Sequence, residues 1–216
     1  NLILKNKSLK SLLDKKDMRK DLVGYMKRLK EMDADQLGKG GVLKWLSEVY
    51  GVEGTAACMF DAKRSLNETR EALSPLLHWF RSKYPYYHQK CMACGEDGTT
   101  ALGTVKAAPE EAATGGAGRA EVIHCPACGK YSRFVRWTAH TKIIDYGKGR
   151  CGEYSSLWYS VCLALGYKTR WVVDWTDHVW VEVLVDGTWA HVDPCEAAFE
   201  DKFMYAGWGK KHTYVV

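Results

Sequence analysis

The sequence contains no run of roughly 20 uncharged apolar residues, which is the length that a membrane-spanning helix requires. It also lacks an apolar signal core after its basic beginning, and it has no internal repeat apart from one doubled cysteine motif. Apolar residues make up 46% of the 216 positions and charged residues 26%, which excludes a disordered or collagen-like chain. We therefore expect a soluble globular protein with one core of ordinary size. Because the first residue is Asn and not Met, we also expect a fragment of a longer protein.

The net charge of +5 is concentrated at the beginning of the chain. Residues 1–30 contain ten Lys or Arg against three Asp, a net charge of +7, so the other 186 residues carry −2. The globular part therefore lacks the basic surface that binding to nucleic acid requires, and we expect neither a nucleic-acid nor a membrane partner. The basic segment is interpreted as the solvated face of a helix. A partner-docking arm and the remnant of a targeting sequence are the alternatives.

Four of the eight cysteines have the spacing of a metal site. They form two Cys-x-x-Cys pairs, Cys91 with Cys94 and Cys125 with Cys128, and a glycine follows each pair. Two such turns can point four thiolates at one ion, and the glycines allow the positive φ angle that aims backbone N–H groups at sulfur. We predict one structural Zn2+ in a reducing compartment, with two disulfides or two redox pairs as the alternative. His124 is a spare candidate ligand, but four cysteines suffice.

The first half of the chain has apolar residues at helical spacings. Residues 9–31 and 35–50 predict two short helices, and residues 65–83 predict a longer one that buries Leu66, Leu73, Leu76, Leu77 and Phe80. Ser65 and Glu68 are placed to form a capping box at its start, and Pro75 is expected to interrupt it. Residues 101–120 contain seven Ala and four Gly, which indicates a flexible connection or a short surface helix without a function.

Residues 149–166 predict a helix that begins at a cysteine. Gly166 suits its end, and one buried face is formed by Tyr154, Leu157, Trp158, Val161, Cys162 and Leu165. Cys151 lies at the helix start, where the helix dipole and the neighbouring Arg150 guanidinium favour the thiolate. Cys162, on the apolar face, is interpreted as a small core residue.

Residues 169–175 predict a strand, and residues 178–193 predict a hairpin around Asp186-Gly187. If these two residues form the turn, His178 opposes Cys195 and Trp180 opposes Asp193. One hairpin face then carries only Val and Ala, which predicts the core side and makes the register firm. The other face carries His178, Trp180, Glu182, Trp189, His191 and Asp193.

On this face His178 and Asp193 are diagonal neighbours, about 7–8 Å apart at the backbone. A carboxylate bonded to one imidazole nitrogen selects the tautomer and leaves the other nitrogen available for chemistry. Together with Cys151, the pair forms the set that nucleophilic catalysis by cysteine requires. His191 is the rival base, although its deeper position in the hairpin favours a structural role. The alternative is that Cys151, His178 and Asp193 are incidental polar residues.

Several segments resemble the cytoplasmic peptide:N-glycanase family of the transglutaminase-like superfamily. They are residues 149–153 (Gly-Arg-Cys-Gly-Glu), 177–180 (Asp-His-Val-Trp), 191–196 (His-Val-Asp-Pro-Cys-Glu) and 207–211 (Gly-Trp-Gly-Lys-Lys), and the cysteine pairs match the family's zinc site in order and position. The resemblance covers residues 70–216. It implies an α+β fold whose papain/transglutaminase-like core packs the nucleophile helix on an antiparallel sheet, with a four-cysteine zinc module at residues 88–130. Residues 1–69 are expected to form a helical N-terminal part.

The resemblance also implies an enzyme that removes N-linked glycans from misfolded glycoproteins. Such an enzyme cleaves the amide between the innermost N-acetylglucosamine and Asn, which becomes Asp. Carried onto this chain, Cys151 is the nucleophile that forms a thioester, His178 the acid/base and Asp193 its orienting partner. The family's glycan-contact positions are similar to Arg170, Trp180, Glu182, Trp189 and Glu196.

Further expectations follow from the resemblance. They are one structural Zn2+ per chain, N-glycosylated misfolded proteins as substrates, a ubiquitin-receptor or proteasome shuttle protein as partner, and a location in the cytoplasm or also the nucleus. The family's flanking carbohydrate-binding and partner-binding domains are expected to lie outside this chain. The chain departs from the family at residues 154–156, Tyr-Ser-Ser in place of Trp-Ala-Asn. The alternatives are a catalytically silent scaffold that retains the fold and the zinc, and a protease or transglutaminase on the same core.

Overall fold

The computed structural model describes residues 24, 38–174, 177–201, 203–210 and 215. The chain divides into two compact units, Asn1–Asp35 and Gln36–Val216, and only Gly24 of the first unit is described. Apart from Gly24, the basic segment 1–30 and the helix expected over 9–31 therefore lie outside the described residues. Within the described ranges, no helix combines the length and apolar character needed to cross a membrane.

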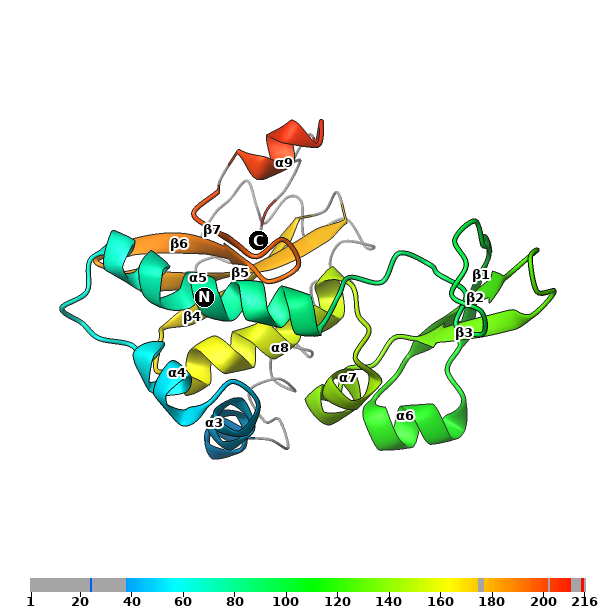
Figure 1. Ribbon diagram of the computed structural model, residues 1–216, viewed down its shortest axis with the longest axis horizontal. Coiled ribbons are helices and arrows are strands. Elements are labelled where there is room, and N and C mark those ends of the chain that lie inside the picture. The colour runs from blue at the N-terminus through cyan, green and yellow to red at the C-terminus, as the bar shows by residue number, and fades with distance from the viewer. Residues whose placement is uncertain (1–23, 25–37, 175–176, 202, 211–214, 216) are drawn as a thin grey trace. The chain divides into compact units, whose positions relative to one another are not determined.

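The described part of the second unit has the predicted α+β fold, with helices and two antiparallel sheets (Figure 1). The smaller sheet has the strand order β1-β2-β3, and the larger sheet has the order β4-β5-β6-β7. The elements are, in chain order, α3 (Gly38–Val49), α4 (Val52–Ala57), α5 (Leu66–Lys83), β1 (Thr100–Lys106), α6 (Pro109–Gly115), β2 (Arg119–His124), β3 (Tyr131–Val135), α7 (His140–Tyr146), α8 (Cys151–Ala164), β4 (Thr169–Asp174), β5 (His178–Val185), β6 (Thr188–Asp193), β7 (Ala198–Phe199) and α9 (Met204–Gly207).

Helix α8 forms the centre of the core, packed against β4 and β5 (Figure 1). Its Tyr154 and Trp158 are fully buried and meet the ring of Phe80 in α5 edge-on, with centroids 5.4 and 5.3 Å apart. The serines between them are buried as well, so the prediction of a single buried face was too narrow: the helix is enclosed on nearly every side. It ends as predicted, with Gly166 at φ 94° directly after the C-cap.

The hairpin of β5 and β6 has the predicted register, since Val181 pairs with Val192 and Val185 pairs with Thr188. The turn residues Asp186 and Gly187 have φ angles of 47° and 71°, the positive values of a type I′ turn. The predicted core face is buried throughout, at 9% exposure or less for Val179, Val181, Val183, Val185, Ala190 and Val192. The opposite face is also covered, where Val172 and Trp180 pack against Tyr205 of α9.

Helix α5 differs from the prediction at Pro75. The capping box is present, because the Ser65 N–H donates to Glu68 Oε2 and the Glu68 N–H donates back to Ser65 Oγ. The helix nevertheless runs unbroken through Pro75. Apolar side chains on both sides of the proline are fully buried, and this packing outweighs the lost backbone hydrogen bond. The domain boundary expected after residue 69 falls inside this helix.

The Ala- and Gly-rich segment 101–120 is also more ordered than predicted. A short helix is present, α6, but it lies between β1 and β2 of the smaller sheet. All seven residues of β1 are exposed, so its sequence shows no alternation of buried and exposed positions. Its backbone pairing with β2, interrupted between Ala101 and Gly103, holds the strand in place.

Candidate active site

The three predicted catalytic residues stand at the ends of three elements. Cys151 is the first residue of α8, His178 is the first of β5, and Asp193 is the last of β6. His178 Nε2 and Asp193 Oδ2 are 2.8 Å apart, and the Cys151 side chain lies close enough to His178 to raise the pKa of its imidazole. The structure therefore brings the three groups together in the predicted order: sulfur, imidazole, carboxylate.

The imidazole of His178 is held in its charged form. Burial alone disfavours the imidazolium, but the hydrogen bonds with Asp193 and Cys151 outweigh it and raise the pKa of His178 to about 9. Although burial opposes the Asp193 carboxylate, its hydrogen bond with His178 lowers the pKa of the Asp193 carboxyl group. At neutral pH the pair is therefore an imidazolium next to a carboxylate.

Asp193 has further partners that the sequence pattern does not reveal. The Cys195 N–H donates to its Oδ1 at 2.8 Å, and the Tyr205 hydroxyl donates to its Oδ2 at 2.8 Å. The same hydroxyl lies 2.7 Å from Nε2 of His191. His191, the rival base, is thus engaged with Tyr205, and its burial lowers its pKa, which keeps the ring neutral. This agrees with the predicted structural role.

The residues expected to contact sugar fall into two groups. The first is a connected cluster in which Arg170 Nε donates to Glu182 Oε2 at 2.6 Å, its guanidinium carbon lies 4.4 Å from the Trp189 ring centroid, and Trp180 Nε1 donates to Glu182 Oε1 at 3.3 Å. Glu196 is apart from these contacts, paired with Arg81 of α5 at 3.4 Å.

Glu196 interacts with the predicted catalytic residues instead of with that cluster. Burial raises the pKa of its carboxyl group, and the charges of Arg81, Asp193 and His178 act on it as well.

The four predicted metal ligands converge. The sulfur atoms of Cys91, Cys94, Cys125 and Cys128 all lie within 4.8 Å of one another, and Cys91 with Cys128 and Cys94 with Cys125 are each 3.7 Å apart. A tetrahedral ion with metal–sulfur bonds of about 2.3 Å separates its sulfurs by about 3.8 Å, so the four thiols can hold one metal ion. All eight cysteines of the chain are free, which excludes the disulfide alternative in this structure.

The two cysteine turns have the same backbone pattern. Gly95 and Gly129 have φ angles of 79° and 68°, and their N–H groups donate to the carbonyl of the first cysteine of each pair at 2.9 and 2.8 Å. The glycines therefore have the predicted conformation. The His124 ring lies against the Tyr131 ring in a tilted arrangement, with centroids 4.8 Å apart, and it is not part of the cysteine cluster.

The transglutaminase-like superfamily matches residues 117–194, a range that includes Cys151, His178 and Asp193. Curated relatives named peptide-N(4)-(N-acetyl-beta-glucosaminyl)asparagine amidase are similar over more of the chain. The rice protein is 36% identical over 153 residues, 69% of this chain and 34% of the relative. The chicken protein is 33% identical over 165 residues (74% and 25%), and that of Caenorhabditis briggsae is 32% identical over 199 residues (90% and 31%).

The chain belongs to the peptide:N-glycanase family. It spans about a quarter to a third of the length of these curated relatives. Within the family, its departure at residues 154–156 concerns the interior of the core. The Tyr154 hydroxyl donates to the Pro85 carbonyl at 3.0 Å, and Ser155 Oγ accepts a hydrogen bond from Trp171 Nε1 at 2.8 Å. The Tyr-Ser-Ser sequence therefore has its own set of buried partners.

The environment of the Arg150 guanidinium differs from the prediction. The Arg150 guanidinium was expected to act on the Cys151 sulfur, but its Nη2 donates to Glu121 of β2 at 2.6 Å. Its positive charge is thus balanced by a carboxylate of the smaller sheet. Neither Glu121 nor Tyr205 carries a motif of its own, so only the fold reveals their contacts with the site.

Proposed function

We propose that this chain hydrolyses the amide bond between N-acetylglucosamine and the asparagine side chain of misfolded N-glycoproteins. The observation that carries the proposal is that the His178 imidazole is bonded to Asp193 and has the Cys151 side chain as its other ionisable neighbour. Membership of the peptide:N-glycanase family supports the choice of substrate, since its relatives are named for this amidase activity.

In the first step, the Cys151 thiolate attacks the carbonyl carbon of the glycosylated asparagine. The carbon–nitrogen bond breaks, and His178 donates its proton to the departing glycosylamine nitrogen. The pKa of His178, about 9, keeps the ring protonated at neutral pH and thus ready for this transfer. A thioester between Cys151 and the former asparagine remains.

In the second step, the neutral His178 removes a proton from water, which attacks the thioester carbonyl. The carbon–sulfur bond breaks, the aspartate product leaves, and the Cys151 thiolate and the imidazolium are restored. Asp193 holds Nε2 of His178 through both steps, so the other ring nitrogen exchanges the protons. This assignment requires no further catalytic group.

The cluster of Arg170, Trp180, Glu182 and Trp189 is proposed as the surface for the glycan. Aromatic rings suit the apolar faces of sugars, and carboxylates accept hydrogen bonds from hydroxyl groups. Glu196 is proposed to contact the sugar nearest to the cleaved bond, because its carboxyl group interacts with His178 and Asp193.

The metal is proposed to be Zn2+ with a structural role, since four thiolates form a closed tetrahedral set without a position for water. The free state of all eight cysteines fits a reducing compartment, so a cytoplasmic and also nuclear location is proposed. A ubiquitin-receptor or proteasome shuttle partner stays a prediction.

The test is deglycosylation of a denatured high-mannose glycopeptide, followed by mass spectrometry for loss of the glycan and conversion of Asn to Asp. We expect cleavage by the wild-type chain and none by Cys151→Ala or His178→Ala. Cys162→Ala is the matched control, because this second cysteine of α8 is fully buried in the core. Absence of cleavage by a folded, zinc-loaded wild-type chain contradicts the proposal, and cleavage of a peptide bond supports a protease.

A further inference from the structure

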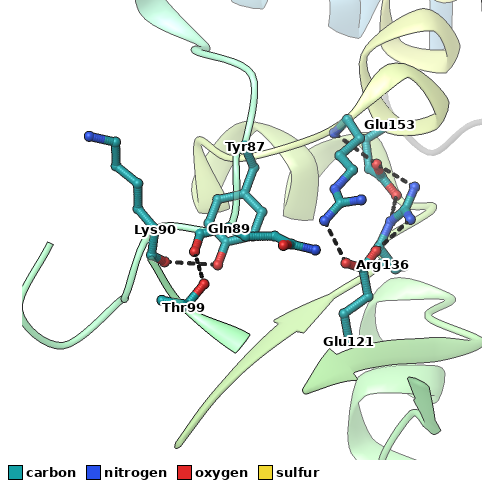
Figure 2. Close-up of polar contacts among 8 residues, drawn as sticks. Tyr87, Gln89, Lys90, Thr99, Glu121, Arg136 and Glu153 are labelled. Carbon is teal, nitrogen blue, oxygen red and sulfur yellow. Dashed lines mark hydrogen bonds and ion pairs between the residues drawn. The ribbon is translucent and has the colours of Figure 1, made fainter. Parts of the chain in front are cut away.

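Two arginines and two glutamates form a closed ring of hydrogen bonds between the smaller sheet and the start of α8 (Figure 2). Arg136, directly after β3, binds Glu153 of α8 through two bonds, Nε to Oε1 at 2.7 Å and Nη2 to Oε2 at 3.0 Å. Its Nη1 donates to Glu121 of β2 at 2.9 Å. Arg150 closes the ring, since its Nη2 donates to Glu121 at 2.6 Å and its backbone N–H donates to Glu153 at 3.0 Å.

The ring is half-buried to buried, and its two positive charges match its two negative charges. Side-chain exposure is 4% for Glu153, 15% for Arg136 and Glu121, and 24% for Arg150. Both guanidinium groups also lie over the ring of Phe134, with their central carbons 5.7 Å from its centroid. Buried ion pairs contribute little net stability compared with apolar packing, but they define geometry. We therefore expect the ring to determine the geometry of this region more than its stability.

The residues that the ring holds are those next to the nucleophile. Glu153 lies two positions after Cys151 in the first turn of α8, and Arg150 is the N-cap residue directly before it. The Arg150 side chain forms no capping hydrogen bond at the start of α8. The backbone N–H of Arg150 donates to the Glu153 carboxylate. The position of the first turn of α8 thus depends on a carboxylate that Arg136 grips with two bonds.

A second connection reaches the same loop from the first cysteine pair. The Tyr87 N–H donates to the Gly149 carbonyl at 2.9 Å, and its hydroxyl donates to the Lys90 carbonyl at 3.0 Å, directly before Cys91 (Figure 2). Its ring stacks on Phe134 at 4.2 Å. Segments next to both cysteine pairs therefore contact residues 149–150, the two residues that precede the nucleophile.

We infer that Arg136 is a positioning residue for the proposed reaction. It anchors the first turn of α8 to the metal-binding module, which is here the predicted segment 88–130 extended through β3 to Arg136, and thereby keeps the Cys151 sulfur near His178. The inference rests on the proposed function for the role of Cys151, but the placement of the sulfur can be measured without a glycan. Loss of Arg136 is expected to loosen the first turn, so that the Cys151 thiol moves away from the His178 imidazole.

The chain offers a matched control in the same module. Arg133 of β3 also binds a glutamate, Glu111 of α6, through two bonds, Nη1 to Oε1 at 2.7 Å and Nη2 to Oε2 at 3.0 Å. This pair stays inside the module and does not reach α8. Substituting Arg133 therefore removes a two-bond arginine–glutamate pair from the same sheet without releasing the nucleophile.

The experiment compares wild type, Arg136→Gln, Arg136→Lys and Arg133→Gln. Zinc content and melting temperature are measured first. The rate of Cys151 alkylation by iodoacetamide is then followed by peptide mass spectrometry between pH 6 and pH 9. Glu121→Gln is a milder variant in case Arg136→Gln does not fold, because it keeps the side-chain shape and weakens only the Arg136 and Arg150 contacts. Deglycosylation gives kcat and KM.

For Arg136→Gln with its metal retained, we expect alkylation at pH 6 to slow about tenfold and to approach the wild-type rate at pH 9. We expect kcat to fall about tenfold or more while KM changes less than about twofold, with partial rescue in Arg136→Lys. Arg133→Gln should match wild type in both measurements. Wild-type alkylation at pH 6 in Arg136→Gln overturns the inference, and so does an equal loss in Arg133→Gln. If wild type does not deglycosylate, the alkylation profiles still decide the positioning role.

Discussion

Tyr205 donates its hydroxyl hydrogen to Oδ2 of Asp193 at 2.8 Å, and this is the oxygen that also contacts His178. The same hydroxyl lies 2.7 Å from Nε2 of His191. Tyr205 therefore connects His191 to the bonded pair of Asp193 and His178. Burial and the nearby Asp193 raise the pKa of Tyr205, which keeps its hydroxyl protonated as a donor. The orientation of His178 therefore depends on a residue of α9, outside the hairpin.

We predict that Tyr205→Phe lowers kcat about five- to tenfold with little change in KM. The substitution removes one of the bonds that hold Asp193, and it leaves a buried His191 nitrogen without this partner, at a cost of about 1–3 kcal/mol in the free energy of unfolding. Steady-state deglycosylation and chemical denaturation measure both effects. Tyr131→Phe is the control, since this tyrosine is 69% exposed and should lose neither activity nor stability. An unchanged kcat in Tyr205→Phe would contradict the role given to the hydroxyl.

A second prediction concerns the stability of the fold as a function of pH. The pKa of His178 is raised to about 9 in the folded chain, whereas unfolded histidine titrates near 6.5. The folded state therefore binds a proton more tightly, and this contribution is complete below about pH 6.5 and is lost as the pH rises through about 9. Its upper limit is about 3 kcal/mol.

This contribution is measured as the difference in the free energy of unfolding between wild type and His178→Gln. We expect the difference to shrink steadily between about pH 6.5 and 9, because glutamine does not titrate. Cys151 and Asp193 are the ionisable groups that raise the pKa of the ring, so both should be retained in the comparison. A difference that stays constant over this range would show that the imidazolium is not stabilised by the fold.

The sequence predicts the local parts of the site well. Alternating Val residues on one side of Asp186-Gly187 determine the strand register, and the register puts His178 and Asp193 on one face. Likewise, the apolar spacing after residue 149 places Cys151 at a helix start. These features depend on periodicity and turn chemistry, which neighbouring residues determine.

The parts that the sequence does not predict are contacts between distant segments. Arg136 meets Glu153 across 17 positions and Glu121 across 15, and nothing in the spacing of these charges distinguishes them from charges on a solvated surface. Strand β1 was not predicted for a related reason. Its backbone pairs with β2, but its side chains do not form an apolar face that the sequence could reveal. The bond of the Arg150 guanidinium with Glu121 was not predicted, because the two residues are 29 positions apart in the sequence.

Pro75 leads to a prediction about stability. This proline is exposed in the middle of α5, where it has no N–H to donate to the preceding turn. We predict that Pro75→Ala raises the free energy of unfolding by about 1–2 kcal/mol. Alanine has a higher helix propensity than proline, and this gain exceeds the stability that proline contributes by restricting the unfolded chain. Urea denaturation measures the change, and Ser74→Ala, at the preceding helix position, is the control. A destabilised Pro75→Ala variant would mean that the proline has a packing role in α5.

The last prediction tests the metal site by replacing one of the four cysteines with serine. We expect one zinc per chain in the purified protein, and loss of most of it in Cys94→Ser, because an alcohol oxygen is a much weaker zinc ligand than a thiolate. The melting temperature should fall with the zinc, since folding of the module and metal binding are coupled. His124→Ala removes the imidazole that lies next to Cys125 in the sequence and contacts the Tyr131 ring. This variant should retain a full equivalent of zinc.

Zinc content by plasma mass spectrometry and thermal denaturation with and without a chelator distinguish the two variants. A wild-type chain that binds less than about half an equivalent after reconstitution under reducing conditions would rule out the four-thiolate site. Zinc loss in His124→Ala that equals the loss in Cys94→Ser would instead make the imidazole a ligand and one of the four cysteines dispensable. Because the segments next to both cysteine pairs contact residues 149 and 150, we expect zinc removal also to slow alkylation of Cys151 at pH 6.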